Sequence, residues 1–198
     1  IETLKAYAYL INLLREYFVQ NRYLEVRLPC IHYGYNKGDI FPLEFFRYPA
    51  RLTSSNALFL NTYAVQLSKV FSLQKCFRAE PSHTNRHLAE FDLFEAAMTN
   101  CNLKGCMAEI EQLIKSVVYE FSKSDFSHMM RVNANLILDS SFPVFEYKQI
   151  DDIYKLENKG LGKYDREIAT NLPAFVINFP IQIASWMAKP IDNKYSLS

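Results

Sequence analysis

One stretch decides how this chain folds: Phe77-Arg-Ala-Glu-Pro-Ser-His-Thr-Asn-Arg-His-Leu-Ala-Glu-Phe-Asp-Leu-Phe-Glu-Ala-Ala-Met98. Apolar residues recur near every second position on both sides of a polar centre, which is typical of two strands joined by a loop. Pro81 cannot donate a hydrogen bond to a strand ladder, so it marks the turn. We therefore predict a hairpin of two strands, from about Val70 to Glu80 and from Ala89 to Met98.

The charged and aromatic residues of this hairpin suggest a ligand. Arg78 and Glu80 are two residues apart, so on the predicted strand both point to one face, and Phe91 and Glu95 share a face in the same way. Three basic residues lie in the loop, where flexible cations can close over an anion: His83, Arg86 and His87. A cation for phosphate, carboxylates for amines and an aromatic ring for a base describe a nucleotide site. The alternative is an exposed hairpin with ordinary cross-strand ion pairs.

Composition limits the class of protein. The chain has 198 residues, of which 49% are hydrophobic, and a formal net charge of +1. This predicts one compact domain with a sizeable core and argues against disorder. The small net charge provides no global attraction to nucleic acid, and no dense Lys/Arg run is present. No apolar stretch reaches membrane-spanning length and no signal peptide is visible, so we expect no membrane association.

Four cysteines are present without a Cys-x-x-Cys spacing: Cys30, Cys76, Cys101 and Cys106. Cys101 and Cys106 are five residues apart and have no nearby histidine to complete a metal site. Reduced structural thiols are the expected state, with no bound metal, and they favour an intracellular location.

Apolar periodicity predicts three helices, over residues 2–21, 57–67 and 103–122, the last capped by Asn102. The expected inward stripe of the first helix is Leu4, Ala8, Ile11, Leu14 and Phe18, and that of the second is Leu58, Thr62, Val65 and Leu67. Residues 23–28, 142–147 and 175–179 are expected strands, and residues 149–157 a further helix. Residues 31–46 are expected to form a loop that returns to a strand, and residues 123–141 are expected to be loop.

Phe77-Arg-Ala-Glu80 followed by Arg86-His-Leu-Ala-Glu-Phe91 is similar to motif 2 of the class II aminoacyl-tRNA synthetases, above all the asparaginyl enzymes and then their aspartyl relatives. The resemblance runs from about Leu13 to Asp192 and includes the segments 50–53, 62–64, 67–70 and 173–180. Motif 2 would cover about 70–98. The helix, strand and Pro29 of residues 11–29 resemble motif 1, which forms the dimer interface in this family.

The resemblance implies an α+β fold, an antiparallel sheet flanked by helices, with residues 1–198 as one catalytic domain truncated before motif 3 and without an anticodon-binding domain. It implies ATP with magnesium as the ligand. Arg78 would be the catalytic residue that holds the α-phosphate, and Glu80 would lie on the adenine side. Arg86, with His83 or His87, would reach the γ-phosphate. Phe91 would stack on adenine, and Glu95 would receive the ammonium group of the amino acid.

The amino-acid side departs from the family pattern. Tyr35 stands where the family has a glutamate, Ala57 replaces a glutamine, Asn61 replaces a glutamate and Met187 replaces a tyrosine. All four would line one pocket. Each lost polar contact costs about 1–3 kcal/mol where the substrate group is left unpaired, so asparagine activation is expected to be impaired.

Three hypotheses follow. The first is a degenerate asparaginyl-tRNA-synthetase-like paralogue, a pseudoenzyme that serves as a structural or interaction module in an RNA-containing assembly. The second is an active asparagine–tRNA ligase whose C-terminal part lies outside this chain. The third is an enzyme that adenylates another carboxylate. Expected partners are a second copy through motif 1 and tRNA or another RNA, in the cytoplasm or the mitochondrial matrix.

Overall fold

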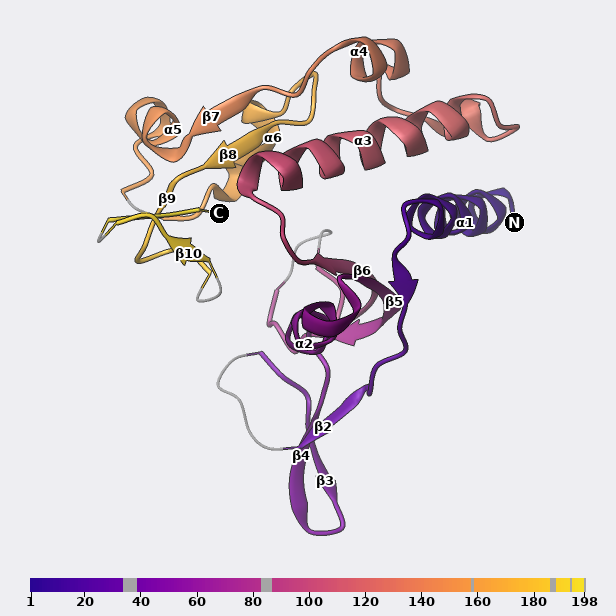
Figure 1. Ribbon diagram of the computed structural model, residues 1–198, viewed down its shortest axis with the longest axis vertical. Helices are drawn as coiled ribbons and strands as arrows, with labels where there is room; N and C mark the ends of the chain where they lie inside the picture. The colour runs from indigo at the N-terminus through magenta and orange to yellow at the C-terminus, as the bar shows by residue number, and fades with distance from the viewer. Residues whose placement is uncertain (34–38, 83–86, 158, 186–187, 193, 198) are drawn as a thin grey trace. The chain divides into compact units, whose positions relative to one another are not determined.

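The computed structural model describes residues 1–33, 39–82, 87–157, 159–185, 188–192 and 194–197. They form two compact units, one of residues 18–100 and one of residues 1–17 with 101–198. Helices and strands occur in both (Figure 1), and the strands pair mainly in antiparallel fashion. The predicted α+β class is confirmed.

The unit of residues 18–100 is built on the predicted hairpin. β5 (Lys69–Phe77) and β6 (Glu90–Met98) pair in antiparallel register from Lys69 opposite Met98 to Phe77 opposite Glu90. β1 (Leu24–Glu25) adds to β5 in parallel, so this sheet is mixed. A second sheet joins β2 (Ile31–Tyr33), β4 (Tyr48–Leu52) and β3 (Pro42–Phe45), all antiparallel. Residues 31–46, expected to be a loop that returns to a strand, contain β3 near their end and also β2 at their start.

The core of this unit combines aromatic stacking with aliphatic packing. Phe18, Phe71 and Phe94 lie with ring centroids 4.9–5.5 Å apart. Helix α2 (Ala57–Leu67) begins and ends as predicted, and it packs on the β5–β6 hairpin (Figure 1). A buried aliphatic cluster joins the helix to the sheet: Leu28, Leu60, Ala64 and Val70.

The predicted inward face was wrong for α2 and only partly right for α1 (Glu2–Gln20), where Phe18 is buried as predicted. In α2, Leu58 is 62% exposed and Val65 is 76% exposed, while Leu60 and Ala64 are buried. In α1, Leu4 is exposed, and Ala6, Leu13 and Tyr17 are buried together with Phe18. Both helices carry apolar residues on more than one side, so their periodicity leaves the buried side undetermined.

The unit of residues 1–17 and 101–198 contains most of α1 and the remaining elements. Its helices are α3 (Leu103–Ser122), η1 (Ser127–Met129), α4 (Ala134–Asp139), α5 (Tyr147–Tyr154), η2 (Gly162–Tyr164) and α6 (Asp165–Ile168). Its strands are β7 (Val144–Glu146), β8 (Phe175–Ile177), β9 (Phe179–Pro180), β10 (Lys189–Pro190) and β11 (Tyr195–Leu197). β7 pairs with β8 in parallel, and β11 pairs with β9 and β10 in antiparallel fashion.

Local capping explains where the helices of this unit begin. The Asn102 side chain accepts a hydrogen bond of 2.9 Å from the Gly105 N–H, so the predicted cap and bounds of α3 are confirmed. Asn133 caps α4 in the same way, which places a short helix inside the segment expected to be loop. Tyr147, Ile150 and Leu156 form the buried core around α5.

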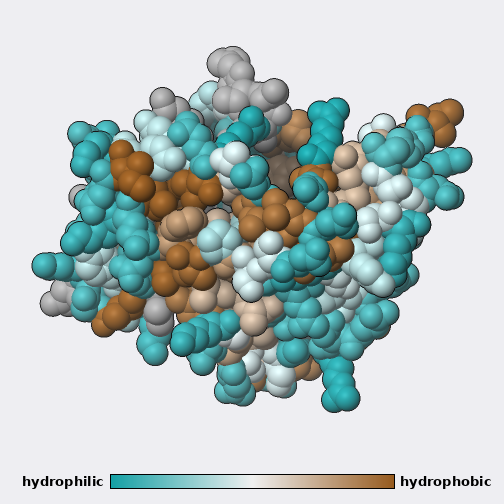
Figure 2. All heavy atoms as spheres, turned by 90° about the horizontal axis from the view of Figure 1, so that it is seen from above, coloured by the Kyte–Doolittle hydropathy of each residue, from teal (hydrophilic) through white to brown (hydrophobic). Residues whose placement is uncertain are grey.

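The outer surface mixes hydrophilic and hydrophobic residues (Figure 2). In the second unit, exposed apolar side chains include Ile110, Leu136 and Ile153. Among the described residues, no helix combines the length and hydrophobicity needed to cross a bilayer.

Tyr17 ties α1 to α3 and provides a pH-dependent prediction. Its hydroxyl donates to the Glu109 backbone oxygen and to Glu109 Oε1, both at 3.3 Å. Burial, then the Glu109 charge and this hydrogen bond, raise the pKa of Tyr17 to about 12. Because the folded pKa lies above the unfolded value of about 10, this stabilisation is present below pH 10 and is lost as the pH rises through 12.

We expect an ultraviolet pH titration of the wild type to show one more tyrosinate than the same titration of Tyr17→Phe. This additional tyrosinate should appear near the raised pKa of Tyr17, about 12. A difference spectrum that titrates near the free tyrosine value of about 10 would contradict the Tyr17–Glu109 contact.

Candidate nucleotide and amino-acid site

The strand register assembles one polar face on the β5–β6 hairpin. Ser72 lies opposite Glu95, and Cys76 lies opposite Phe91. Because side chains alternate along a strand, these residues and Gln74 project to the same side of the sheet. Phe91 and Glu95 therefore share a face, as their spacing indicated. The opposite side carries Phe71 and Phe94, which pack in the core.

Arg78 and Glu80 lie just beyond the strand, because β5 ends at Phe77. The expectation that the strand reaches Glu80 was wrong, although the Arg78 N–H still donates to the Ala89 oxygen at 2.9 Å. Pro81 and the polar residues around it interrupt the ladder. Arg78 is thus held by the backbone at the loop end of the hairpin.

The Arg78 guanidinium lies over the Phe91 ring, with Cζ 5.3 Å from the ring centroid. A cation over an aromatic face is attracted by the ring quadrupole, and an exposed pair of this kind contributes about 0.5–1 kcal/mol. The two residues predicted to hold phosphate and base are therefore in contact with each other. The side chain of Arg78 itself is exposed to solvent.

Glu80 and His87 form a second pair at the hairpin loop. Glu80 Oε2 lies 3.6 Å from His87 Nε2, a contact that is ionic only when the histidine is protonated. The other ring nitrogen of His87 lies 3.1 Å from Ser82 Oγ. The remaining predicted phosphate contacts, His83 and Arg86, lie outside the described residues, so their roles stay predictions.

On the amino-acid side, both oxygens of Glu95 already accept hydrogen bonds. Ser55 Oγ donates to Oε1 at 2.6 Å, and the Asn56 N–H donates to Oε2 at 2.6 Å. Short hydrogen bonds to an ionised acceptor are among the stronger ones in proteins. An ammonium group that approached Glu95 would have to share or displace these donors.

Asn56 extends this network into the protein. Its side chain is completely buried, its Oδ1 accepts from Gln74 Nε2 at 2.9 Å, and its Nδ2 lies 3.6 Å from Cys76 Sγ. Gln74 Oε1 in turn accepts from the Leu28 N–H at 3.2 Å. The buried amide of Asn56 is therefore hydrogen-bonded at both ends, as a buried polar group requires.

Cys76 contributes a neutral thiol to this network. Burial, then the nearby charge of Glu95, raise the pKa of Cys76 to about 11, despite the opposing effects of Arg78 and the Asn56 hydrogen bond. The thiol stays protonated at neutral pH, so Cys76 acts as a packing and hydrogen-bonding group and lacks nucleophilic character.

The other predicted pocket residues are only partly brought together. The Ala57 N–H donates to Ser55 Oγ at 3.2 Å, so Ala57 adjoins the network without a polar side chain. Asn61 is one turn further along α2 and is exposed. Tyr35 and Met187 lie outside the described residues.

The sequence reasoning missed Asn56, although the signal was available. The family pattern Leu-Thr-Val-Ser-Gly-Gln-Leu, set against Leu52-Thr-Ser-Ser-Asn-Ala-Leu58, places Asn56 where the family has a glycine. A side chain at a glycine position must occupy space that the family leaves open. Gln74 and Cys76 carried no such signal, because their role appears only when the strands pair.

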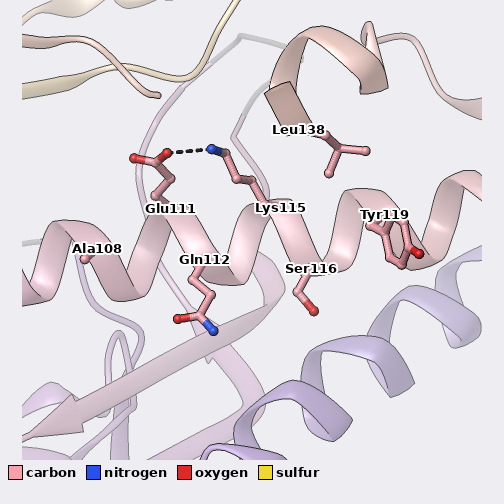
Figure 3. Close-up of a pocket in the computed structure, with 7 residues that line it drawn as sticks. All are labelled: Ala108, Glu111, Gln112, Lys115, Ser116, Tyr119 and Leu138. Carbon is pink, nitrogen blue, oxygen red and sulfur yellow. Dashed lines mark ion pairs between the residues drawn. The ribbon is translucent and has the colours of Figure 1, made fainter. Parts of the chain in front are cut away.

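A separate groove of about 600 Å³ runs along α3. Its lining comes from α3 and from Leu138 of α4: Ala108, Glu111, Gln112, Lys115, Ser116, Tyr119 and Leu138. Figure 3 shows the 2.7 Å ion pair between Glu111 and Lys115 at its edge. None of the predicted site residues lines this groove. Among the described residues, no group of three or more His, Cys, Asp or Glu side chains could hold a metal ion.

Comparison with known proteins identifies the class. The family model for class II tRNA synthetases (D, K and N) matches residues 1–197. The chain belongs to this family, which confirms the resemblance drawn from motif 2.

Within the family, similar proteins include asparaginyl enzymes. The probable cytoplasmic asparagine–tRNA ligase of Enterocytozoon bieneusi is 30% identical over 203 residues, which cover 89% of this chain and 44% of that protein. The cytoplasmic asparagine–tRNA ligase of Saccharomyces cerevisiae is 28% identical, covering 94% of this chain and 37% of the yeast protein. The chain thus spans about half the length of such relatives, or less.

Solved structures of asparaginyl and aspartyl enzymes share the fold of this chain. Asparaginyl-tRNA synthetase from Pyrococcus horikoshii, complexed with asparaginyl-adenylate, superposes with a TM-score of 0.88 at 27% identity, covering 98% of this chain and 49% of the archaeal chain. The aspartyl enzyme of Entamoeba histolytica gives a TM-score of 0.69 at 19% identity and shares the fold.

Proposed function

We propose that this chain is an asparaginyl-tRNA-synthetase-like domain that retains an ATP-binding hairpin and has closed its amino-acid compartment. In this role it is a degenerate paralogue that serves as a structural or interaction module, in an assembly that contains tRNA or another RNA. The family assignment and the asparaginyl relatives support the scaffold. The observation that carries the loss of activation is the buried amide of Asn56.

The surroundings of Asn56 support the proposal that the amino-acid compartment is closed. Its side chain is fully buried and bonded to Gln74, and its N–H occupies one oxygen of Glu95 while Ser55 occupies the other. Hydrogen bonds to charged groups are each worth about 1.5–3 kcal/mol. A substrate ammonium would have to use the remaining lone pair of each oxygen beside these donors or displace them. Each displaced donor would offset part of the affinity of a small ligand.

The nucleotide half supports retained ATP binding. Arg78 is exposed at the end of the hairpin and lies against Phe91. In this proposal the guanidinium pairs with the α-phosphate and the ring stacks on adenine, with Glu80 on the adenine side. Residues Arg86, His83 and His87 would complete the phosphate contacts. Magnesium would be held through the phosphates of ATP, as is usual for this ion.

A second candidate is an active asparagine–tRNA ligase. The names of the relatives and the retention of Arg78 and Glu95 favour it. A third, adenylation of another carboxylate, is favoured by the combination of a kept hairpin and a changed pocket.

Dimerisation through α1 belongs to the same proposal. The apolar stripe that the sequence placed inward is partly at the surface, with Leu4 73% exposed and Ala8 exposed. A second copy could cover these side chains. A cytoplasmic location is supported by the names of the yeast and Enterocytozoon relatives.

The test is asparagine-dependent exchange of pyrophosphate into ATP. We expect no exchange above background for this chain, with ATP still bound in a parallel calorimetric titration. Exchange with asparagine that disappears in Arg78→Ala would establish the ligase instead. Exchange with a different carboxylate, and none with asparagine, would establish the third candidate.

A further inference from the structure

A cavity of about 340 Å³ lies in the unit that contains α5 and β7 to β11. Its lining comes from the start of α5, the β8–β9 junction and the turn into β11: Glu146, Lys148, Asn178, Ile191, Asp192 and Tyr195. The volume falls within the range of small-molecule sites. The function proposed above uses none of these residues.

The carboxylates of the cavity are fixed by the backbone. Asp192 Oδ1 accepts from the N–H groups of Lys194 and Tyr195 at 2.6 and 2.8 Å. These two bonds lower the pKa of Asp192, so it is ionised at neutral pH. Glu146 caps α5 and takes part in a capping box with Gln149. The second oxygen of Asp192 accepts no hydrogen bond from the described residues, so it is available to a ligand.

The side chains of Lys148 and Asn178 are hydrogen-bond donors that the cavity offers to a ligand. Within the described part of the chain, neither Lys148 Nζ nor the Asn178 amide has a hydrogen bond or ion pair. The backbone of Asn178 has a φ of 60°, which lies in the left-handed region. Asparagine tolerates this region better than most residues. An ammonium group and an amide that share a cavity are suitable ligands for a carboxylate.

We propose that this cavity binds a small zwitterion that carries one carboxylate and one ammonium group, the chemistry of a free amino acid. Lys148 and Asn178 would bind its carboxylate, and Asp192 its ammonium. Ile191 would contact the carbon skeleton. The two kinds of charge line one cavity. A ligand with only one charged group would therefore make only one of the two charge-assisted contacts. This inference is independent of the ATP-binding hairpin.

The experiment is amide NMR of the ¹⁵N-labelled chain titrated with L-leucine and L-glutamine, with acetate and ethylammonium as half-ligands. We expect saturable shifts at millimolar concentrations that include the amides of Lys148 and Tyr195, and affinity at least about tenfold lower for either half-ligand. Lys148→Met should weaken binding about tenfold or more, and Lys148→Arg should keep most of it.

Lys104→Met, which removes an exposed lysine on α3, is the matched control and should leave the affinity unchanged. Native-like amide spectra of both methionine variants show whether each is folded. No saturable shift with either amino acid up to about 20 mM would overturn the proposal. Equal affinity for acetate, or unchanged binding in a folded Lys148→Met variant, would also overturn it.

Discussion

Asn56→Leu is expected to lower the free energy of unfolding of the unit that contains the hairpin by about 2–4 kcal/mol. Leucine is similar in size but cannot accept the hydrogen bond from Gln74 or donate to Cys76. The half-buried Gln74 amide would then lose its 2.9 Å partner, and its Nε2 would keep only the 4.0 Å contact with Cys30 Sγ. A hydrogen-bonding group that loses its partner in a partly buried position costs about 1–3 kcal/mol. The branched side chain adds packing strain. Urea denaturation followed by circular dichroism measures the difference.

The matched control is Asn61→Leu on the same helix. Asn61 is exposed. The replacement of asparagine by leucine at this position should therefore change the free energy of unfolding by only about 0.5 kcal/mol. If Asn56→Leu were as mild as Asn61→Leu, the buried network around Asn56 would not exist as described.

Arg78→Ala is expected to reduce the affinity for magnesium-ATP by about 10- to 100-fold. A charge-assisted contact to phosphate is worth about 1.5–3 kcal/mol, and every 1.4 kcal/mol is about tenfold in affinity. The Arg78 side chain is exposed. Its removal should therefore have little effect on the free energy of unfolding, so the variant should remain folded. Isothermal calorimetry on both proteins measures the effect.

Two further variants test whether the loss of ATP affinity is specific to the Arg78 side chain. Lys75 lies on β5, on the side of the sheet opposite to Cys76 and Phe91, and pairs with Asp92 at 3.1 Å, so Lys75→Ala should leave ATP affinity unchanged. Arg78→Lys keeps the charge but lacks the planar fork, and we expect an intermediate affinity. Equal losses in Lys75→Ala and Arg78→Ala would indicate a nonspecific electrostatic effect rather than a site.

Much of the fold followed from local sequence signals. The β5–β6 hairpin came from period-two alternation around Pro81, and the bounds of α3 came from Asn102 and the apolar repeat behind it. Such signals depend on neighbouring residues in the chain, which is why they could be interpreted without a structure.

What the sequence could not reveal depends on tertiary contacts. The buried side of α2 is Leu60 and Ala64 because they meet Leu28 and Val70, which lie elsewhere in the chain. The predicted pocket residues came from the family pattern, and Asn56 was overlooked because its meaning depends on Gln74 and Cys76 across the sheet. Cross-strand partners of this kind become visible only once the register is known.

The central claim is tested most directly by calorimetric titration of asparagine into the ATP-saturated chain, beside the variant Asn56→Gly/Ala57→Gln/Asn61→Glu, which restores the family residues at these three positions. We predict no binding to the wild-type chain up to about 10 mM asparagine, and measurable binding to the triple variant. Saturable binding of asparagine to the wild-type chain would show that its amino-acid compartment is open and would contradict the account.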